Sequence, residues 1–353
     1  MPKIAIIGTT SWGVTLAVLL ARKKIEVDLW ARSDKEAAEF AANKQNSGFI
    51  PPGVQIPPNL SVTSSLDQAL KTAQAVILAV PSQTMRQNVK LIAGHLSDTM
   101  LIISAAKGLE ISSRKRMSLV IGEEIPARLK HNICVLSGPN LAPEIMKGLP
   151  SATVIASEHV HSARKAQKLL ASPSLCVYTN TDVIGVELGG SMKNIIALGA
   201  GIADGLGYGD NAKAALITRG LTEMTALGHS LGANPLTFSG LAGLGDLIAT
   251  CASPLSRNHH VGVELTKGRS LEDITSTMTG VAEGVTTTQV VWELAKQLGL
   301  AMPITQGIHS ILYENADLKT AVAELMQAEA DHELTGRKWQ LFSSLRRSRS
   351  RNT

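Results

Sequence analysis

Residues 182–204 read DVIGVELGGSMKNIIALGAGIAD, and this stretch decides the architecture that we predict for the second half of the chain. Leu188, Met192, Ile195 and Ile202 recur at helical spacing, and further apolar residues continue that surface round the other sides. The pattern predicts a helix that is buried on nearly all sides. Its glycines each lower helix propensity by about 1 kcal/mol relative to alanine, so contacts with neighbouring elements must stabilise the helix.

Lys193 lies within this predicted buried helix. Burial of an ammonium group costs free energy unless a counter-charge or hydrogen bonds compensate it. We therefore expect Lys193 either to be paired or to take part in chemistry; a lysine that extends to solvent from the edge of a domain interface is the alternative. Glu187 and Lys193 near the centre of the helix argue against a membrane span, because central charges are costly in lipid.

The composition indicates two folded domains and a basic tail. The chain has 353 residues, of which 44% are hydrophobic and 3% aromatic, so we expect two domains with aliphatic cores. Six Lys or Arg residues and no Asp or Glu follow Gly336, which leaves a net charge of −1 for the remainder of a chain whose total is +5. We expect residues 336–353 to be a solvated, disordered tail, with contact to nucleic acid or a membrane surface as the alternative.

The cysteines and the N-terminus favour a reducing compartment. Cys134, Cys176 and Cys251 are widely spaced and odd in number, which argues against a disulfide framework and a zinc site. The first residues run directly into an apolar segment without a signal-peptide pattern. We therefore expect a cytoplasmic protein.

The first part of the chain alternates between predicted strands and helices. Residues 3–7 form an apolar run, residues 14–21 have helical apolar spacing, and residues 26–30 form a second strand. The turn at residues 8–13 reads GTTSWG, and a strand, a glycine turn and a helix in this order are typical of a dinucleotide-binding βαβ unit. Thr10 occupies a place where glycine is usual, so the motif is weaker than standard, and a similar turn that binds no dinucleotide is the alternative.

Arg32 follows the second predicted strand, at a place where an NAD-preferring enzyme often has Asp or Glu to bind the ribose diol. An arginine there can stack on adenine or contact a 2′-phosphate. The residue therefore favours NADP, or use of both cofactors, over strict use of NAD.

Further apolar runs predict the rest of a mostly parallel sheet. They are residues 75–80, 100–104, 132–137, 152–156 and 175–178. The carboxyl ends of such strands face the ligand crevice. Lys107 follows the run at 100–104 and is therefore a candidate contact for an anion or a carbonyl, with a solvated loop lysine as the alternative.

The second half of the chain is predicted to be helical. Ser256 is a plausible N-cap of a helix that begins at Arg257, a combination that suits a phosphate, with a surface cap as the alternative. The histidines at 259 and 260 and the DHE sequence at 331–333 lack the i, i+4 spacing of helical metal ligands, so we predict no metal.

Several motifs, taken in order, resemble those of the bacterial NAD(P)-dependent glycerol-3-phosphate dehydrogenases. They are Gly8-xx-Ser11-Trp12-Gly13, Lys107-Gly108, Gly138-Pro139-Asn140-x-Ala142, Glu187-xxxxx-Lys193-Asn194, Gly243-xx-Asp246-xxx-Thr250-Cys251, Ser256-Arg257-Asn258 and Val281-x-Glu283-Gly284. The resemblance extends over nearly the whole chain except the tail. It implies a Rossmann-like α/β domain with a mostly parallel, doubly wound sheet at residues 1–181 and an all-α domain at residues 182–335.

The resemblance also implies an activity and the residues that perform it. The activity is the reversible reduction of dihydroxyacetone phosphate to sn-glycerol 3-phosphate for phospholipid synthesis, with Lys193 as general acid/base in a homodimer that acts on a small phosphorylated substrate. The implied substrate contacts are Lys107, Gly138, Asn140, Asn194, Asp246, Thr250, Ser256, Arg257 and Asn258. The implied NADP or NAD contacts are Gly8, Ser11, Trp12, Gly13, Arg32, Lys107, Ala142, Arg257, Val281 and Glu283.

Elementary chemistry agrees with this implied function. Hydride addition turns a ketone oxygen into an alkoxide, so the site needs a proton donor and positive potential where the charge develops. Thr10 and Asn140 depart from the family pattern, because glycine and serine or threonine are usual there. The alternatives are a sister reductase of the β-hydroxyacid or ketopantoate type, a nucleotide sensor without catalysis, and a nucleic-acid-associated protein that uses the tail.

Overall fold

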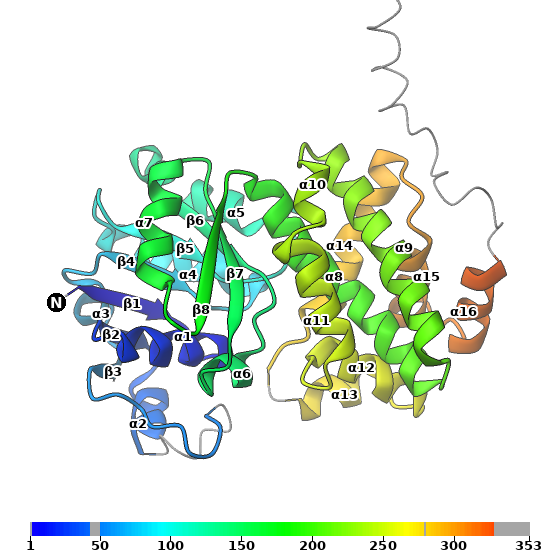
Figure 1. Cartoon of the computed structure of the whole chain (residues 1–353), viewed down its shortest axis with the longest axis horizontal. Coiled ribbons are helices and arrows are strands. Elements are labelled where there is room, and N and C mark those ends of the chain that lie inside the picture. Colours follow the sequence, from blue (N-terminus) through cyan, green and yellow to red (C-terminus); the bar gives the residue numbers. More distant parts are fainter. Residues whose placement is uncertain (1, 43–49, 279, 328–353) are drawn as a thin grey trace, which may run out of the picture.

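The structure is a computed structural model and describes residues 2–42, 50–278 and 280–327. The predictions for residues 331–333 and for the tail at 336–353 lie outside the described residues. Within the described part, an α/β region is followed by a helical region, and the two lie side by side (Figure 1). The change from strand to helix falls between Asn180 and Val183.

An eight-stranded sheet forms the centre of the N-terminal region. Its strands are β1 (Lys3–Ile7), β2 (Glu26–Trp30), β3 (Leu60–Thr63), β4 (Ala75–Leu78), β5 (Leu101–Ser104), β6 (Ile133–Ser137), β7 (Ser151–Ala156) and β8 (Leu175–Asn180). They lie in the order β3-β2-β1-β4-β5-β6-β7-β8. Neighbouring strands are parallel except β6 and β7, which confirms the predicted mostly parallel sheet.

Helices cover both faces of this sheet (Figure 1). They are α1 (Ser11–Arg22), α2 (Asp34–Ala42), α3 (Leu66–Leu70), α4 (Met85–Ile92), α5 (Met117–Glu124), α6 (Ala142–Met146) and α7 (Val160–Leu170). One core joins the sheet to α1, α6 and α7, and another joins it to α3, α4 and α5. Strands β4 and β5 are buried along their whole length, which explains their unbroken apolar sequences.

The stretch at 182–204 forms the central helix of the C-terminal region, as predicted. This helix is α8 (Val183–Gly205), and 20 of its 23 residues are buried. The others are α9 (Gly209–Ser230), α10 (Pro235–Phe238), α11 (Asp246–Ala252), α12 (Arg257–Thr266), α13 (Leu271–Thr277), α14 (Glu283–Leu298), α15 (Pro303–Tyr313) and α16 (Leu318–Gln327). Helices α9, α11, α12 and α14 pack around α8, and a single apolar core joins them.

Glycines let α12 approach α8 closely. A Cβ at Gly201 would overlap the carbonyl oxygen of His259, and a Cβ at Gly262 would overlap that of Leu198. These contacts hold the first two turns of α12 beside the C-terminal half of α8. The glycines that weaken α8 as an isolated helix therefore allow the packing that stabilises it.

The segment before α11 has an unusual backbone. Residues Leu241–Gly245 form a π-helical turn that leads into α11. Its backbone lies against α8, where a Cβ at Gly189 would overlap the Ala242 carbonyl oxygen. This close approach fixes the start of α11 against α8.

Among the residues that the structure describes, two helical segments are long and apolar enough to cross a membrane by length and composition alone. They are Val183–Gly205, whose most apolar window is 94% buried, and Pro235–Ala252, whose window is 44% buried. The core helix of a folded domain passes the same test, and the burial of α8 accounts for its apolar sequence.

Candidate active site

The candidate site lies where the carboxyl edge of the sheet meets α8. Lys107 follows β5 and Gly138 follows β6, so both residues lie at the edge that faces ligands in sheets of this type. Gly190 of α8 approaches this edge so closely that a Cβ there would overlap the Ser137 hydroxyl oxygen. The site is therefore formed by both parts of the chain.

The Asp246 carboxylate bridges two lysines. Lys107 Nζ donates a hydrogen bond to Asp246 Oδ2 at 2.6 Å, and Lys193 Nζ donates to Asp246 Oδ1. Lys193 also donates to the Thr250 hydroxyl at 2.5 Å, and Lys107 donates to the carbonyl oxygen of Gly138 at 2.7 Å. Lys193 is 6% exposed and Asp246 1%, so Lys193 is buried and paired rather than extended to solvent.

The charges of this cluster suit a site that donates a proton. Two ammonium groups and one carboxylate leave one excess positive charge in a site that largely excludes water. Burial lowers the pKa of Lys107 from its ordinary 10.5 to about 8; Lys193 adds to this effect and Asp246 opposes it. Positive charge held in such a site stabilises an oxygen that becomes negative.

Two amide side chains connect three elements beside this cluster. Asn258 Nδ2 donates to Asn194 Oδ1 at 2.8 Å, and Asn258 Oδ1 accepts from the backbone N–H of Gly284 at 2.9 Å. Asn194 Nδ2 in turn donates to the Lys107 carbonyl oxygen at 3.3 Å. These bonds tie the ends of α12 and α14 to α8 and to the loop after β5.

Some buried polar atoms at this edge have no partner among the described residues. They include Asn140 Oδ1 and Ser137 Oγ. The Asn140 amide is oriented by the hydrogen bond that its Nδ2 donates to Thr153 Oγ1 at 3.0 Å. Buried polar atoms are usually satisfied, so a free acceptor and a free hydroxyl here indicate a place for a polar ligand.

Ser256 and Arg257 begin α12 as the sequence predicts. The Ser256 hydroxyl accepts from the backbone N–H of His259 at 3.2 Å and caps the helix. The structure therefore shows the cap, and the hydroxyl proton of Ser256 stays available to a ligand. Arg257 is exposed on the first turn, where its charge adds to that of the helix N-terminus.

The turn after β1 has the backbone that a dinucleotide requires. Gly8 has a φ of +110°, which favours glycine, and a Cβ at Gly13 would overlap the Gly8 carbonyl oxygen. Thr10 has a φ of −71° and caps α1 by accepting from Gly13 N at 3.1 Å, so threonine fits without backbone strain. The indole Nε1 of Trp12 is buried without a partner among the described residues. These residues fit a bound dinucleotide at the N-terminus of α1, which begins at Ser11.

Three other predicted cofactor residues lie outside this turn, next to three different elements. Arg32 follows β2, and its side chain is 80% exposed. Ala142 begins α6 beyond β6, and Val281, which is 43% exposed, precedes α14. No hydrogen bond or ion pair joins these three residues to one another within the described part of the chain.

Sequence reasoning did not single out Ser82 as a site residue. Glu283 Oε1 accepts from the backbone N–H of Ser82 at 2.9 Å, and Glu283 Oε2 accepts from its hydroxyl at 2.5 Å. Burial raises the pKa of Glu283, and the hydrogen bonds from Ser82 oppose that rise. The position of Ser82 soon after β4, at the carboxyl edge, was the available signal.

Glu187 makes a further buried contact between the two regions. Glu187 of α8 accepts hydrogen bonds from the Ser118 backbone N–H at 2.7 Å and hydroxyl at 2.6 Å, and it forms an ion pair with Arg116 at 2.5 Å. The resemblance included Glu187 without a role. Its contacts fix the start of α5 against α8.

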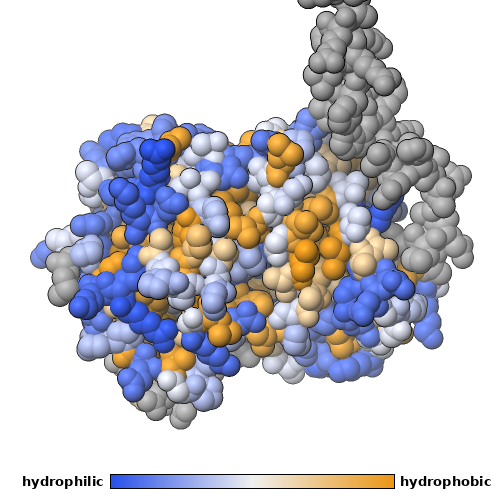
Figure 2. All heavy atoms as spheres, viewed as in Figure 1, coloured by the Kyte–Doolittle hydropathy of each residue, from blue (hydrophilic) through white to orange (hydrophobic). Residues whose placement is uncertain are grey.

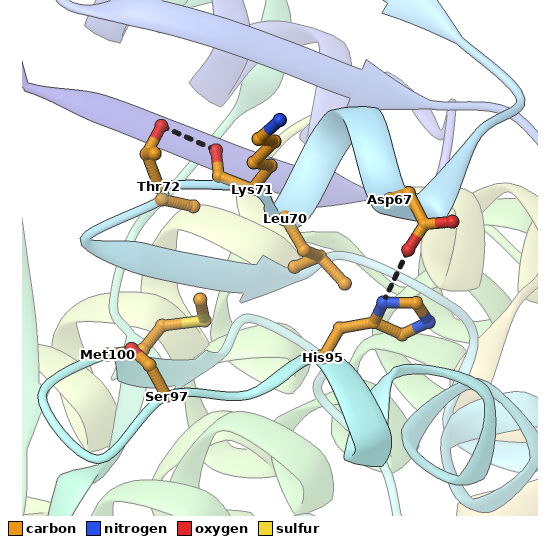
Figure 3. Close-up of a pocket in the computed structure, with 8 residues that line it drawn as sticks. Asp67, Leu70, Lys71, Thr72, His95, Ser97 and Met100 are labelled. Atoms are coloured by element: carbon orange, nitrogen blue, oxygen red, sulfur yellow. Dashed lines mark hydrogen bonds and ion pairs between the residues drawn. The ribbon is translucent and has the colours of Figure 1, made fainter.

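A separate cavity of about 470 Å³ lies at the opposite edge of the sheet (Figure 3). Its lining includes Ala73 and Met100, which lie just before β4 and β5. His95 and Asp67 also line it, and His95 Nδ1 lies 3.1 Å from Asp67 Oδ1. It contains none of the predicted site residues. The described part of the chain has no cluster of three His, Cys, Asp or Glu residues that could hold a metal ion.

Comparisons with known proteins agree on one family. Residues 3–163 match the N-terminal domain, and residues 182–323 the C-terminal domain, of NAD-dependent glycerol-3-phosphate dehydrogenase. A glycerol-3-phosphate dehydrogenase [NAD(P)+] of Dehalococcoides mccartyi is 61% identical over 353 residues, which cover 100% of this chain and 98% of that protein. The one from Chlorobium limicola is 46% identical over 331 residues, or 94% and 99% of the two chains.

A solved structure gives the same result. The crystal structure of glycerol-3-phosphate dehydrogenase from Coxiella burnetii has a TM-score of 0.87 to this fold at 36% sequence identity, and the match covers 92% of this chain and 99% of that one. Both domains, the full length and the fold therefore match. The chain belongs to the NAD-dependent glycerol-3-phosphate dehydrogenase family.

Proposed function

We propose that this chain is a glycerol-3-phosphate dehydrogenase [NAD(P)+] that reversibly reduces dihydroxyacetone phosphate to sn-glycerol 3-phosphate with Lys193 as the general acid/base. Relatives that carry this name match the chain over its whole length, which supports the activity. The observation that carries the assignment of Lys193 is the Asp246 carboxylate that bridges Lys193 and Lys107. The product is a building block for phospholipids.

Lys193 would hold the proton that the reaction needs. As the substrate carbonyl oxygen gains negative charge, Lys193 Nζ gives that oxygen a proton, and in the reverse direction it takes the proton from the alcohol. Asp246 and Thr250 orient the ammonium group, and the excess positive charge of the two lysines stabilises the developing alkoxide. Lys107 would hold the carbonyl oxygen from the side of the sheet.

The phosphate of the substrate would bind at the start of α12. Arg257 supplies a guanidinium group, and the N-terminus of α12 supplies its backbone N–H groups and dipole. The free hydroxyl proton of Ser256 and the free acceptor of Asn140 suit the remaining phosphate and hydroxyl groups. Asn194 and Asn258 would act mainly by positioning, because their bonds tie α8, α12 and α14 together.

The nicotinamide cofactor, when bound, supplies or accepts the hydride. Gly8, Ser11, Trp12 and Gly13 would hold its pyrophosphate at the N-terminus of α1. Other parts of the cofactor would contact Ala142, Val281 and Glu283. Arg32 would contact a 2′-phosphate, so we propose that the enzyme uses both cofactors and favours NADP.

We propose a cytoplasmic homodimer. Figure 2 shows apolar residues gathered on the face of the helical domain over α9 and α11. Large exposed hydrophobic residues of that domain include Leu236, Ile248 and Leu255, at 77%, 49% and 52% exposure. Exposed apolar surface of this kind suits a protein contact. Light scattering of the purified chain measures the subunit number directly, and a monomer at micromolar concentration would contradict the proposal.

The residues of the site argue against two alternative functions, a ketopantoate-type reductase and a nucleotide sensor without catalysis. A ketopantoate-type reductase would not need Ser256, Arg257 and Asn258 at the start of α12. A sensor without catalysis would not need the buried lysine pair with its shared carboxylate.

The test follows the absorbance of NADPH, and separately of NADH, after addition of dihydroxyacetone phosphate. We expect oxidation of both cofactors, with NADPH used faster. Absence of oxidation with dihydroxyacetone phosphate, but turnover of another phosphorylated ketone, would show that the proposed substrate is wrong.

A further inference from the structure

We infer that Glu36 sets the balance between NADH and NADPH, by accepting hydrogen bonds from a ribose that has free hydroxyls and by repelling a 2′-phosphate. Glu36 lies in the first turn of α2, where acidic residues are common. The inference rests on the proposed function, because it deepens the cofactor site of that function.

The Glu36 carboxylate lies across the ends of two strands. Its Oε1 accepts a hydrogen bond from the Thr9 hydroxyl, and its Oε2 accepts from the backbone N–H of Arg32 at 3.1 Å. Thr9 belongs to the turn after β1, and Arg32 follows β2. In dinucleotide-binding sheets an acidic residue at the end of the second strand binds the adenosine ribose, and Arg32 lies at that position here. Glu36 therefore supplies, from a helix, the carboxylate that is absent from the end of β2.

Glu36 and Arg32 offer opposite charges to the same part of a ligand. Glu36 Oε2 lies 3.5 Å from Arg32 Nε, and the two side chains are 27% and 80% exposed. The carboxylate can accept hydrogen bonds from a ribose diol, whereas a 2′-phosphate would meet a like charge there and an opposite charge at Arg32. A chain with both residues in contact can bind either ribose.

The carboxylate is ionised at neutral pH. Burial opposes ionisation, but hydrogen bonds from Thr9 and Arg32 outweigh it and lower the pKa of Glu36. The other acidic groups nearby have different partners. Asp34 accepts from the Ser64 hydroxyl, and Glu39 pairs with Lys35 at 3.9 Å on the next turn of α2. Glu39 is 63% exposed and provides a matched control for the loss of one charge from α2.

The test compares two nucleotides that lack the nicotinamide. ADP-ribose and 2′-phospho-ADP-ribose are titrated calorimetrically into wild type, Glu36→Gln, Arg32→Gln and Glu39→Gln, in the absence of substrate. We expect Glu36→Gln to shift the affinity ratio at least about tenfold towards the 2′-phosphorylated ligand, because it removes a charge and an acceptor. Arg32→Gln should shift the ratio in the opposite direction, and Glu39→Gln should leave it within about twofold.

The outcomes separate this inference from the proposed function. Normal binding with a ratio in Glu36→Gln that matches wild type, or an equal shift in Glu39→Gln, would overturn the role of Glu36 and leave the proposed enzyme intact. Failure of the wild-type chain to bind either nucleotide would overturn the proposed cofactor site and the role of Glu36 together.

Discussion

The lysine end and the nucleotide end of the candidate site differ in how their charged groups are held. At the lysine end, Asp246 is 1% exposed and joins a lysine of the sheet region to a lysine of α8. At the nucleotide end, Arg32 is 80% exposed and its charged partner, Glu36, lies in the next helix along the chain. The first arrangement is set by long-range packing before any ligand binds. The second is local and solvated, so its energetics depend more on the ligand.

The difference matters because burial strengthens electrostatic interactions and raises the cost of breaking them. Changes at the lysine end should therefore have large effects on catalysis and on stability. Changes at the nucleotide end should alter the affinity for the cofactor and have little effect on kcat or on stability. The following variants test that contrast, in order of decreasing effect.

Asp246→Asn should have the largest effect, because it leaves two buried ammonium groups without their shared anion. We expect kcat/KM to fall at least about 100-fold, because the general acid/base and its neighbouring lysine lose the carboxylate that orients them. Steady-state kinetics with dihydroxyacetone phosphate measures the change. Asp28→Asn is the matched control, since Asp28 pairs with Lys3 at 2.8 Å in the sheet region. Similar losses in both variants would show a general stability effect.

Glu187→Gln should weaken the contact between the two regions. The amide keeps an acceptor oxygen but loses the charge that pairs with Arg116, so we expect a loss of about 2 kcal/mol in unfolding free energy. Denaturant titration measures it. Glu110→Gln is the control, because Glu110 is also buried and pairs with Arg86 at 2.7 Å within the sheet region. If Glu187 positions the domains, only Glu187→Gln lowers kcat/KM; an equal loss in Glu110→Gln would contradict this.

The pH dependence should report on Lys107. Its pKa of about 8 in the folded protein lies below the ordinary 10.5, so Lys107 loses its proton above pH 8 in the folded chain while the unfolded chain keeps it. Activity that needs this positive charge should therefore fall by about tenfold for each pH unit above 8. For the same reason, the contribution of Lys107 to stability should rise between pH 8 and 10.5.

The control for this pH profile is the binding of NADPH, measured over the same pH range. Binding of NADPH at the distant turn should vary much less over the same pH range than the kcat/KM of dihydroxyacetone phosphate. A kcat/KM that stays constant up to pH 9.5 would contradict the role of the Lys107 charge.

Thr10→Gly should have the smallest effect. Thr10 has an extended backbone, caps α1, and donates from its hydroxyl to the Ala79 carbonyl oxygen at 2.7 Å. Replacement of an N-cap threonine by glycine costs only a few tenths of a kcal/mol, and we expect the KM for NADPH to stay within about twofold. Thr10→Ser, which keeps the hydroxyl, serves as the control. A KM that falls more than about tenfold in Thr10→Gly would show that the threonine obstructs the pyrophosphate.

The same contrast explains what could be predicted from the sequence. The buried helix at 182–204, the parallel strands and the turn at 8–13 follow from short-range patterns, and the structure contains all of them. Lys107 was a candidate because it follows a strand, and Lys193 because it interrupts an apolar helix. Such signals can be read from a short stretch of sequence around each residue.

Long-range contacts gave no comparable signal. Ser82 and Glu283 are 201 residues apart and Lys107 and Asp246 are 139 apart, so no local pattern predicts that they touch. The antiparallel pairing of β6 with β7 and the π-helical turn before α11 also depend on packing between elements. Glu36 is a different case, because Arg32 is only four residues away, but Thr9 is 27 residues away and the position of Glu36 resembles an ordinary helix start.

The most direct test of the account measures the rate of dihydroxyacetone phosphate reduction by Lys193→Ala together with direct binding of NADPH. General acid/base catalysis contributes about 10²–10⁴-fold, so we expect kcat to fall by at least about 100-fold while the Kd for NADPH stays within about twofold. A variant that retains more than about a tenth of kcat, which is about 1.4 kcal/mol of barrier or less, would contradict the role of Lys193.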